Sequence, residues 1–224
     1  TQPCSSAASD VYKRQYLQPA KKIADDLLEA KKGIVIVEAN NGKRVQTFST
    51  SGGLFEKGEL LILVDEDSAS ASEVVAGAVQ DNDRGLIIGR RTFGKGLVQQ
   101  QMPLGQGDQV RLTTARYYTP TGRSIQRPYD TSSRTDYYAV VRKRHQTGEM
   151  NDPSKIPIND SLIFTTPKGK KVYGGGGITP DIYVSTQETK DELWNDYIIG
   201  SNLIDLFVFL ELDKNVKNFN FDNK

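Results

Sequence analysis

The chain has 224 residues, a length that suits one large domain or one domain with an appendage. Hydrophobic residues make up 37% of it and charged residues 25%, and the mean hydropathy is −0.52, which excludes a disordered or collagen-like chain. The 29 basic and 28 acidic residues leave a formal net charge of +1, so we expect no nucleic-acid partner. No run of about 18 apolar residues occurs, so the sequence predicts no membrane span.

The sequence contains one cysteine, Cys4, and one histidine, His145. These numbers exclude a disulfide framework and a metal site built on Cys or His, and the sequence predicts no cofactor. His145 ends the basic stretch 142–145, which predicts a solvated loop. A Ser-His-Asp triad would have to use this histidine, so a hydrolase built on this chain is expected to use another base.

Residues 1–15, TQPCSSAASDVYKRQ, are polar and have no clear periodicity. They resemble translated adapter sequence at the end of an environmental assembly, and we interpret them as a non-native artefact. The native sequence then begins near Tyr16, within a domain. We expect a core domain over residues 16–190, incomplete at its N-terminus, and a helical extension over residues 191–224.

Alternating helical and strand patterns occupy the first half of the chain. In order, they predict a helix over 16–32, strands over 34–37, 45–50 and 60–64, a small-residue helix over 72–80 and a strand over 86–88. The run 60–64 is continuously apolar, as in a strand that is buried on both faces. This order of strand, helix and strand predicts an α/β core with parallel pairing.

The pattern changes after Gly96. In order, the sequence predicts antiparallel strands over 97–102 and 109–118, a turn over 119–122, a long polar surface loop over 123–157, a flexible turn at 174–177 and a helix over 193–212. The second half therefore adds an antiparallel β segment and a C-terminal helix to the α/β core.

Ser70 lies where the predicted strand ending at Val64 gives way to a helix. Backbone N–H groups at a helix start have no helical acceptor and can stabilise an oxyanion. Ser70 and Glu73 also match a capping box, in which the serine only begins the helix. From these residues alone, both interpretations stay open.

Lys95 lies between two glycines, with Phe93 and Leu97 nearby. Desolvation in such a setting favours the neutral amine, which can take a proton from a serine. The alternative is an ordinary turn lysine. Residues 89–96 also approach the phosphate-binding pattern G-x-x-x-x-G-K-[ST], but Gly96 replaces the hydroxyl residue and a strand follows. Nucleotide binding is therefore the weaker hypothesis.

Three segments in order resemble the C-terminal processing, or tail-specific, serine peptidases. They read LVDEDSASASEVVAGAVQDNDRGLIIGRRTFGKGLVQ, RLTTARYYTPTGRSIQ and GGGGITPDI. The resemblance covers much of residues 58–181 and implies an α/β core related to the Clp protease and crotonase folds. It also implies a serine endopeptidase that cleaves proteins or peptides near their C-terminal tails.

The resemblance assigns roles to individual residues. Ser70 matches the nucleophile, and Lys95, 25 positions later, matches the general base. Gln99 matches the residue that orients the lysine, the Ala71 N–H matches an oxyanion donor, and Asp81 matches a supporting acidic residue. The alternative interpretation of Asp81 is a turn residue at the end of a helix, with no role in the site.

The resemblance further implies that the partners are proteins or peptides with a free C-terminal tail. It also implies a place in the bacterial cell envelope. A homo-oligomer is a possible state of the protein. Members of this family usually carry a PDZ domain and a glycine-containing strand end before the region that matches Tyr16, and neither is present in this sequence. The alternative is therefore an inactive fragment, or a ligand-binding or scaffold module of the same fold.

Overall fold

The computed structural model describes residues 17–105, 108–128, 142–186 and 210. The chain divides into two compact units, one ending at Ser185 and the other beginning at Thr186. The helix expected over residues 193–212 lies outside the described residues, apart from residue 210.

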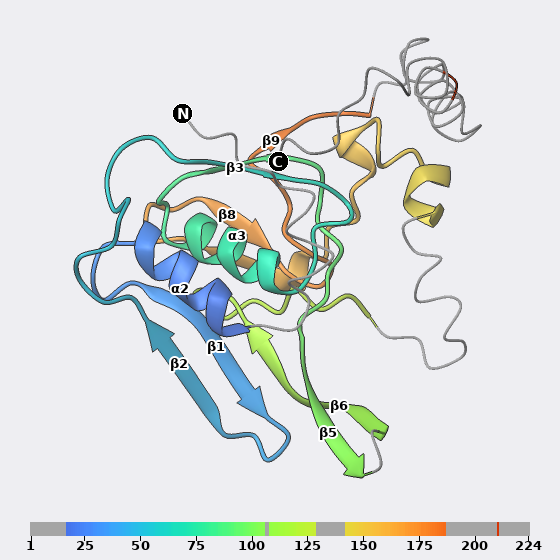
Figure 1. The fold of residues 1–224 in the computed structure, drawn as a ribbon. Helices are drawn as coiled ribbons and strands as arrows, with labels where there is room; N and C mark the ends of the chain where they lie inside the picture. Colours follow the sequence, from blue (N-terminus) through green and yellow to red (C-terminus); the bar gives the residue numbers. More distant parts are fainter. Residues whose placement is uncertain (1–16, 106–107, 129–141, 187–209, 211–224) are drawn as a thin grey trace. The chain divides into compact units, whose positions relative to one another are not determined.

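Two helices lie side by side in this unit (Figure 1). Helix α2 spans Leu17–Leu27 and buries Ala20 and Ala24, which recur at the spacing of one helical face. Helix α3 spans Ala71–Asp81 and is rich in small residues, most of them buried. It contacts α2 and also one strand from each of the two larger sheets, so α3 is the central element of the core.

The larger sheet is antiparallel and has the strand order β2-β1-β6-β5. Its strands are β1 (Gly33–Ala39), β2 (Arg44–Phe48), β5 (Leu97–Gly105) and β6 (Asp108–Tyr118). The expected antiparallel pairing of the β5 and β6 segments is confirmed. Strand β1 pairs antiparallel with both of its neighbours, so the parallel part of the core is confined to other strands.

The parallel sheet has the order β3-β4-β9. Its strands are β3 (Leu61–Val64), β4 (Leu86–Gly89) and β9 (Ile182–Tyr183). The parallel pairing of β3 with β4 is confirmed, and β9, a strand that the sequence did not predict, also pairs parallel with β4. A short hairpin of β7 (Ile163–Thr165) and β8 (Lys171–Tyr173) and two 3-10 helices, η1 (Pro153–Lys155) and η2 (Asp160–Leu162), complete the unit. Residues 142–146 are helical, so the loop predicted around His145 is partly wrong.

The prediction that the strand over 60–64 is buried on both faces is wrong for the described part of the chain, and its neighbour β4 is also exposed on one face. Leu61 and Leu63 are 59% and 67% exposed and Leu86 is 43% exposed, whereas Val64 and Ile87 are buried. Side chains alternate between the faces of a strand, and here only one face packs against the core. A continuous apolar run cannot show from the sequence which of its faces is covered.

The expectation of a long surface loop over residues 123–157 is also wrong at its start. Arg123 and Ile125 are fully buried and Arg127 is 5% exposed. The Arg123 guanidinium donates to the Asp81 carboxylate at 2.6 Å and to the carbonyl of Tyr173 at 2.9 Å. Because its charge is paired and its donors find acceptors, this arginine can lie inside the protein.

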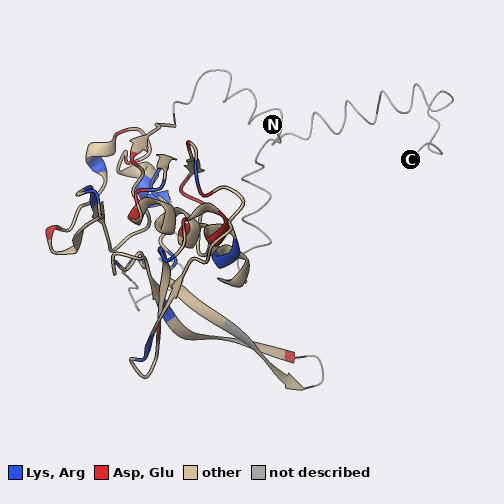
Figure 2. Ribbon diagram, turned by 90° about the vertical axis from the view of Figure 1, so that its left-hand side faces the viewer, with Lys and Arg blue, Asp and Glu red and all other residues tan. Residues whose placement is uncertain are grey.

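The charged residues show no separation by sign in the described part of the chain. Figure 2 shows ribbon segments of basic and of acidic residues interspersed over the body of the unit, while the arm of β5 and β6 carries few of either. Within the described residues, no helix has the length and apolar character needed to cross a bilayer. In the same ranges, no group of three or more His, Cys, Asp or Glu residues is arranged to hold a metal ion.

The buried pair of Arg123 and Asp81 generates the first prediction. Replacing Arg123 by Met keeps an apolar stem but leaves the Asp81 carboxylate buried without its counter-charge. We expect the free energy of unfolding, measured with urea, to fall by about 3–5 kcal/mol. The control is Arg44→Met, since Arg44 pairs with Glu38 at the surface and its side chain is 63% exposed. A control that loses as much stability as Arg123→Met would contradict this account.

Candidate active site

Ser70 stands at the turn between the parallel sheet and α3. It is the N-cap residue of α3, it is 9% exposed, and its backbone has φ 58° and ψ −110°. A residue other than glycine with positive φ is strained, and such strain persists only where the surroundings hold it. The predicted position of Ser70 between a strand and a helix is therefore confirmed, with a backbone conformation that the sequence did not indicate.

The Glu73 carboxylate holds Ser70 and the lysine-bearing loop together. It lies in the first turn of α3 and is fully buried. Its Oε2 accepts the N–H of Ser70 at 2.7 Å and the N–H of Lys95 at 2.9 Å. Its Oε1 accepts the N–H of Gly94 at 2.7 Å and the hydroxyl of Thr92 at 2.5 Å. One carboxylate thus fixes the start of α3 against residues 92–95.

Tyr117 on β6 connects the same two residues through their carbonyl groups. Its hydroxyl oxygen lies 2.8 Å from the carbonyl oxygen of Ser70 and 2.5 Å from that of Lys95, so its single proton is shared between them. Its side chain is 2% exposed. Ser70 and Lys95 are therefore held at their N–H groups by Glu73 and at their carbonyl groups by Tyr117.

The Lys95 amino group is directed toward the next strand. Its Nζ donates to Oε1 of Gln99 at 3.2 Å, and Lys95 itself is half-buried. Gln99 lies on β5, where the pairing with β6 shifts register between Val98 and Gln99. Such irregularities change the direction of side chains and are frequent beside active sites. The structure therefore brings together Lys95 and Gln99, two of the residues singled out in the sequence.

Ala71 is the first residue of α3. Its N–H belongs to the first turn of the helix, where backbone donors have no acceptor within the helix itself. The partial positive charge of a helix N-terminus also favours a negative charge at this position. An oxyanion that forms beside Ser70 would meet this end of α3.

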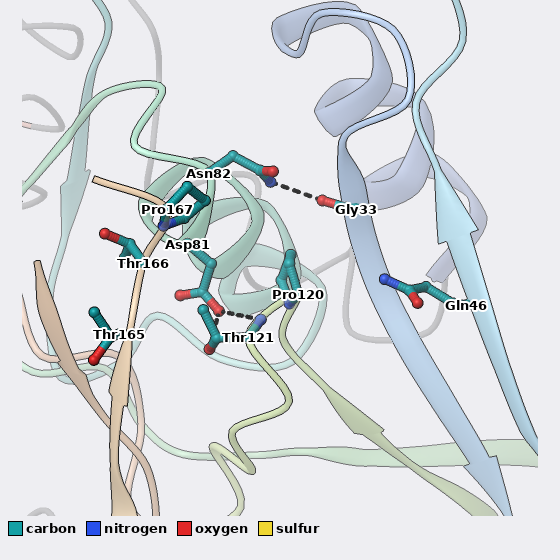
Figure 3. A pocket seen from close by; sticks show the side chains of 9 residues that line it. All are labelled: Gly33, Gln46, Asp81, Asn82, Pro120, Thr121, Thr165, Thr166 and Pro167. Atoms are coloured by element: carbon teal, nitrogen blue, oxygen red, sulfur yellow. Dashed lines mark hydrogen bonds between the residues drawn. The ribbon is translucent and has the colours of Figure 1, made fainter. Parts of the chain in front are cut away.

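Asp81 lies at the other end of α3, roughly 16 Å along the helix from Ser70. Its carboxylate binds Arg123 and accepts the N–H and the hydroxyl of Thr121 at 3.0 and 2.6 Å. Figure 3 shows Asp81 and Asn82 at a pocket of 360 Å³ into which Thr165 and Thr166 also project. Asp81 thus supports the fold at the far end of the helix and does not reach Ser70.

Burial raises the pKa of the Glu73 carboxyl, while its four hydrogen bonds act in the opposite direction. An ionised Glu73 can accept all four donors, whereas a protonated one carries a donor of its own. The raised pKa means that the folded protein binds this proton more tightly than the unfolded chain does. Stability from this group is therefore fully present below the unfolded pKa and is lost as the pH rises through the folded value.

The two alternative chemistries find less support. Strand β5 begins at Leu97, directly after the loop of Lys95 and Gly96, so the helix that would hold a phosphate group does not follow the glycine-rich stretch. The His145 side chain is 52% exposed and its Nε2 lies 3.9 Å from Glu66. The expectation that His145 is solvated is confirmed.

Three supporting residues carry little or no signal in the sequence. The capping pattern indicates Glu73 only as a partner of Ser70, and no sequence pattern singles out Tyr117 or Thr92. Glu73 follows Ser70 by three positions, so the capping pattern predicts its contact with the N–H of Ser70 but not its contacts with the loop of Lys95. The contacts of Glu73 with Thr92 and of Tyr117 with Ser70 span 19 and 47 positions, and no local pattern predicts them.

A strained serine beside a glycine-flanked lysine has the residue types of a serine hydrolase with a lysine base. The chain belongs to peptidase family S41, whose model matches residues 16–131. A carboxy-terminal-processing protease of Bartonella bacilliformis is 45% identical over 111 residues, which are 49% of this chain and 25% of that protein. A probable CtpA-like serine protease of Staphylococcus epidermidis is 30% identical over 221 residues, which are 93% of this chain and 40% of that protein.

The similarity extends to a chloroplast protein and to a solved structure. The chloroplastic C-terminal processing peptidase of Tetradesmus obliquus is 45% identical over 93 residues, 41% of this chain and 20% of that protein. The photosystem II D1 C-terminal processing protease is 29% identical, with a TM-score of 0.48, over 75% of this chain and 31% of that chain. The present chain covers between 20% and 40% of the length of the three curated relatives named above.

The buried carboxylate generates the second prediction. In Glu73→Gln, the amide nitrogen would face two of the four donors that now bind the carboxylate, so we expect the free energy of unfolding to fall by about 1–3 kcal/mol at acidic pH. Because burial raises the pKa of Glu73, the difference between wild type and variant should shrink as the pH rises above about 4.5, the ordinary value for this group. Urea denaturation at several pH values measures this difference, and a gap that widens with pH would contradict the account.

Proposed function

We propose that this chain is part of a serine endopeptidase in which Ser70 is the nucleophile and Lys95 the general base. The observation that carries the proposal is the double connection between the two residues. Glu73 binds both of their N–H groups, and the Tyr117 hydroxyl contacts both of their carbonyl oxygens. Catalytic groups need such fixed placement on rigid elements.

The proposed reaction begins with neutral Lys95 taking the hydroxyl proton of Ser70. The Ser70 oxygen attacks the scissile carbonyl, and the N–H of Ala71 at the start of α3 stabilises the oxyanion that forms. Lys95 then gives its proton to the leaving amine, which breaks the peptide bond and leaves an ester on Ser70. Water, activated by Lys95, hydrolyses this ester and restores the enzyme.

Gln99 orients the base in this proposal. Its amide oxygen accepts from Nζ of Lys95 and so restricts the rotation of a long side chain. Ordering such a side chain costs conformational entropy. Because Gln99 offers a fixed acceptor, part of this cost is already met before the reaction begins. Asp81 supports the reaction only through the fold, because its partners lie at the other end of α3.

The proposed substrates are proteins or peptides that are cleaved near a free C-terminal tail. The names of the bacterial and chloroplastic relatives describe C-terminal processing, and this chain shares their family. The family resemblance implies a place in the bacterial cell envelope for the whole protein, and two of the relatives named above are bacterial proteases of this class. An inactive module of the same fold is the alternative, and the presence of both Ser70 and Lys95 speaks against it.

The third prediction concerns proteolysis of an unstructured peptide by this chain. We expect Ser70→Ala and Lys95→Ala each to lower kcat/KM by about 10³-fold or more, since each removes a group that acts in bond cleavage. Gln99→Ala should cost about 10-fold to 100-fold, since the base remains but is less well placed.

The matched control is Ser72→Ala. Ser72 lies two positions after Ser70, and its hydroxyl donates to the carbonyl of Ala69. We expect this variant to retain cleavage within about threefold of wild type, because it does not contact the reacting groups. Full cleavage by Ser70→Ala or by Lys95→Ala, measured with a fluorogenic peptide, would overturn the proposed function.

A further inference from the structure

The Thr92 side chain lies between the Glu73 carboxylate and a distant glycine-rich segment. Thr92 is fully buried, and its hydroxyl donates to Oε1 of Glu73 at 2.5 Å. The Thr92 hydroxyl oxygen also accepts the N–H of Ile178 at 2.7 Å. Because an N–H can only donate, the contact with Ile178 leaves the hydroxyl proton of Thr92 free to point at Glu73.

The backbones of the two segments are joined as well. The N–H of Thr92 donates to the carbonyl of Ile178 at 3.1 Å. Gly177 has φ 93°, and a Cβ built on it would lie 2.4 Å from the carbonyl oxygen of Thr92 and 2.9 Å from its hydroxyl oxygen. Only glycine permits this approach, so Gly177 is required by contact as well as by backbone conformation.

The glycine segment, residues 174–178, is itself fixed. The N–H of Gly175 donates to the carbonyl of Ser124 at 2.6 Å, and that of Gly177 donates to the carbonyl of Ile125 at 2.8 Å. Ile125 and Ile178 are fully buried. The flexible turn predicted from the four glycines is therefore wrong, because hydrogen bonds and close packing fix this segment.

We propose that Thr92 is a positioning residue of the candidate active site, through which the glycine segment sets the Glu73 carboxylate and, with it, the backbones of Ser70 and Lys95. The chain of contacts runs from the N–H of Ile178 to the Thr92 hydroxyl and from there to Glu73. Hydrogen bonds in such a series polarise one another. This inference rests on the proposed function for its catalytic consequence, but its structural part can be tested without activity.

The first experiment removes the hydroxyl and then restores it. Thr92→Val keeps the shape of the side chain, and Thr92→Ser keeps the hydroxyl. The rate at which a fluorophosphonate probe labels Ser70 is the readout, because the probe reacts with the nucleophile without needing peptide-binding contacts. We expect Thr92→Val to slow labelling by about tenfold or more, and Thr92→Ser to stay within about threefold of wild type.

The matched control is Thr166→Val. Thr166 is 4% exposed, and its hydroxyl donates to the Asp83 carboxylate at 2.7 Å and accepts the N–H of Lys170 at 3.1 Å. It therefore repeats the hydrogen bonding of Thr92 in a part of the unit that does not contact Glu73. We expect Thr166→Val to lose stability but to label at nearly the wild-type rate, which separates positioning from a general loss of packing.

The second experiment alters the glycine segment directly. In Gly177→Ala, the added methyl group would press on Thr92, whereas in Gly169→Ala the φ of 86° is just as strained but nothing lies within 4 Å. Amide hydrogen exchange at Ser70 and Lys95 is the readout, since both N–H groups bind Glu73. Gly177→Ala and Thr92→Val should speed this exchange by about tenfold, and Gly169→Ala should not.

These measurements distinguish the two proposals. A wild-type chain that the probe does not label would overturn the proposed function, and the amide exchange would then decide the positioning role alone. Unchanged exchange at Ser70 and Lys95 in Thr92→Val would overturn the inference, as would labelling of Thr92→Val at the wild-type rate. Equal slowing of Thr92→Val and Thr166→Val would also overturn it.

Discussion

The buried carboxylate of Glu73 is the interaction on which the rest of this unit depends. A charged group without exposure to water is costly unless hydrogen bonds replace its hydration, and Glu73 receives four of them. These bonds come from the N-cap of α3 and from three residues of the loop before β5. The carboxylate thus determines how the central helix meets the loop that carries Lys95.

The strain at Ser70 follows from the same arrangement. A serine with φ 58° would relax to an ordinary conformation unless both of its peptide groups were held. Glu73 binds its N–H and Tyr117 contacts its carbonyl oxygen, so the surroundings fix the unusual conformation. Rigid placement of this kind is what a nucleophile and its base require before substrate arrives. Structural support and proposed chemistry therefore use the same contacts.

Local patterns in the sequence were enough to predict the order of strands and helices as far as β6, the position of Ser70 before a helix and the strand after Lys95. They could not predict contacts between distant segments. The burial of Arg123 depends on Asp81, 42 positions earlier, and a charged residue in a polar stretch gives no sign of such a partner. The exposure of Leu61 and Leu63 depends on which face of the parallel sheet is covered, and an apolar run in the sequence does not show this. Tyr117 contributes through its hydroxyl, but its strand position indicated only packing.

The most direct test of the account is an experimental structure of the chain after reaction with a fluorophosphonate. The account predicts a covalent bond to Oγ of Ser70, a phosphoryl oxygen against the N–H of Ala71, and Nζ of Lys95 about 2.6–3.2 Å from Oγ. A probe bound to another residue would contradict it. So would a Lys95 Nζ that lies beyond the reach of one bridging water while Glu73 still binds both backbone N–H groups.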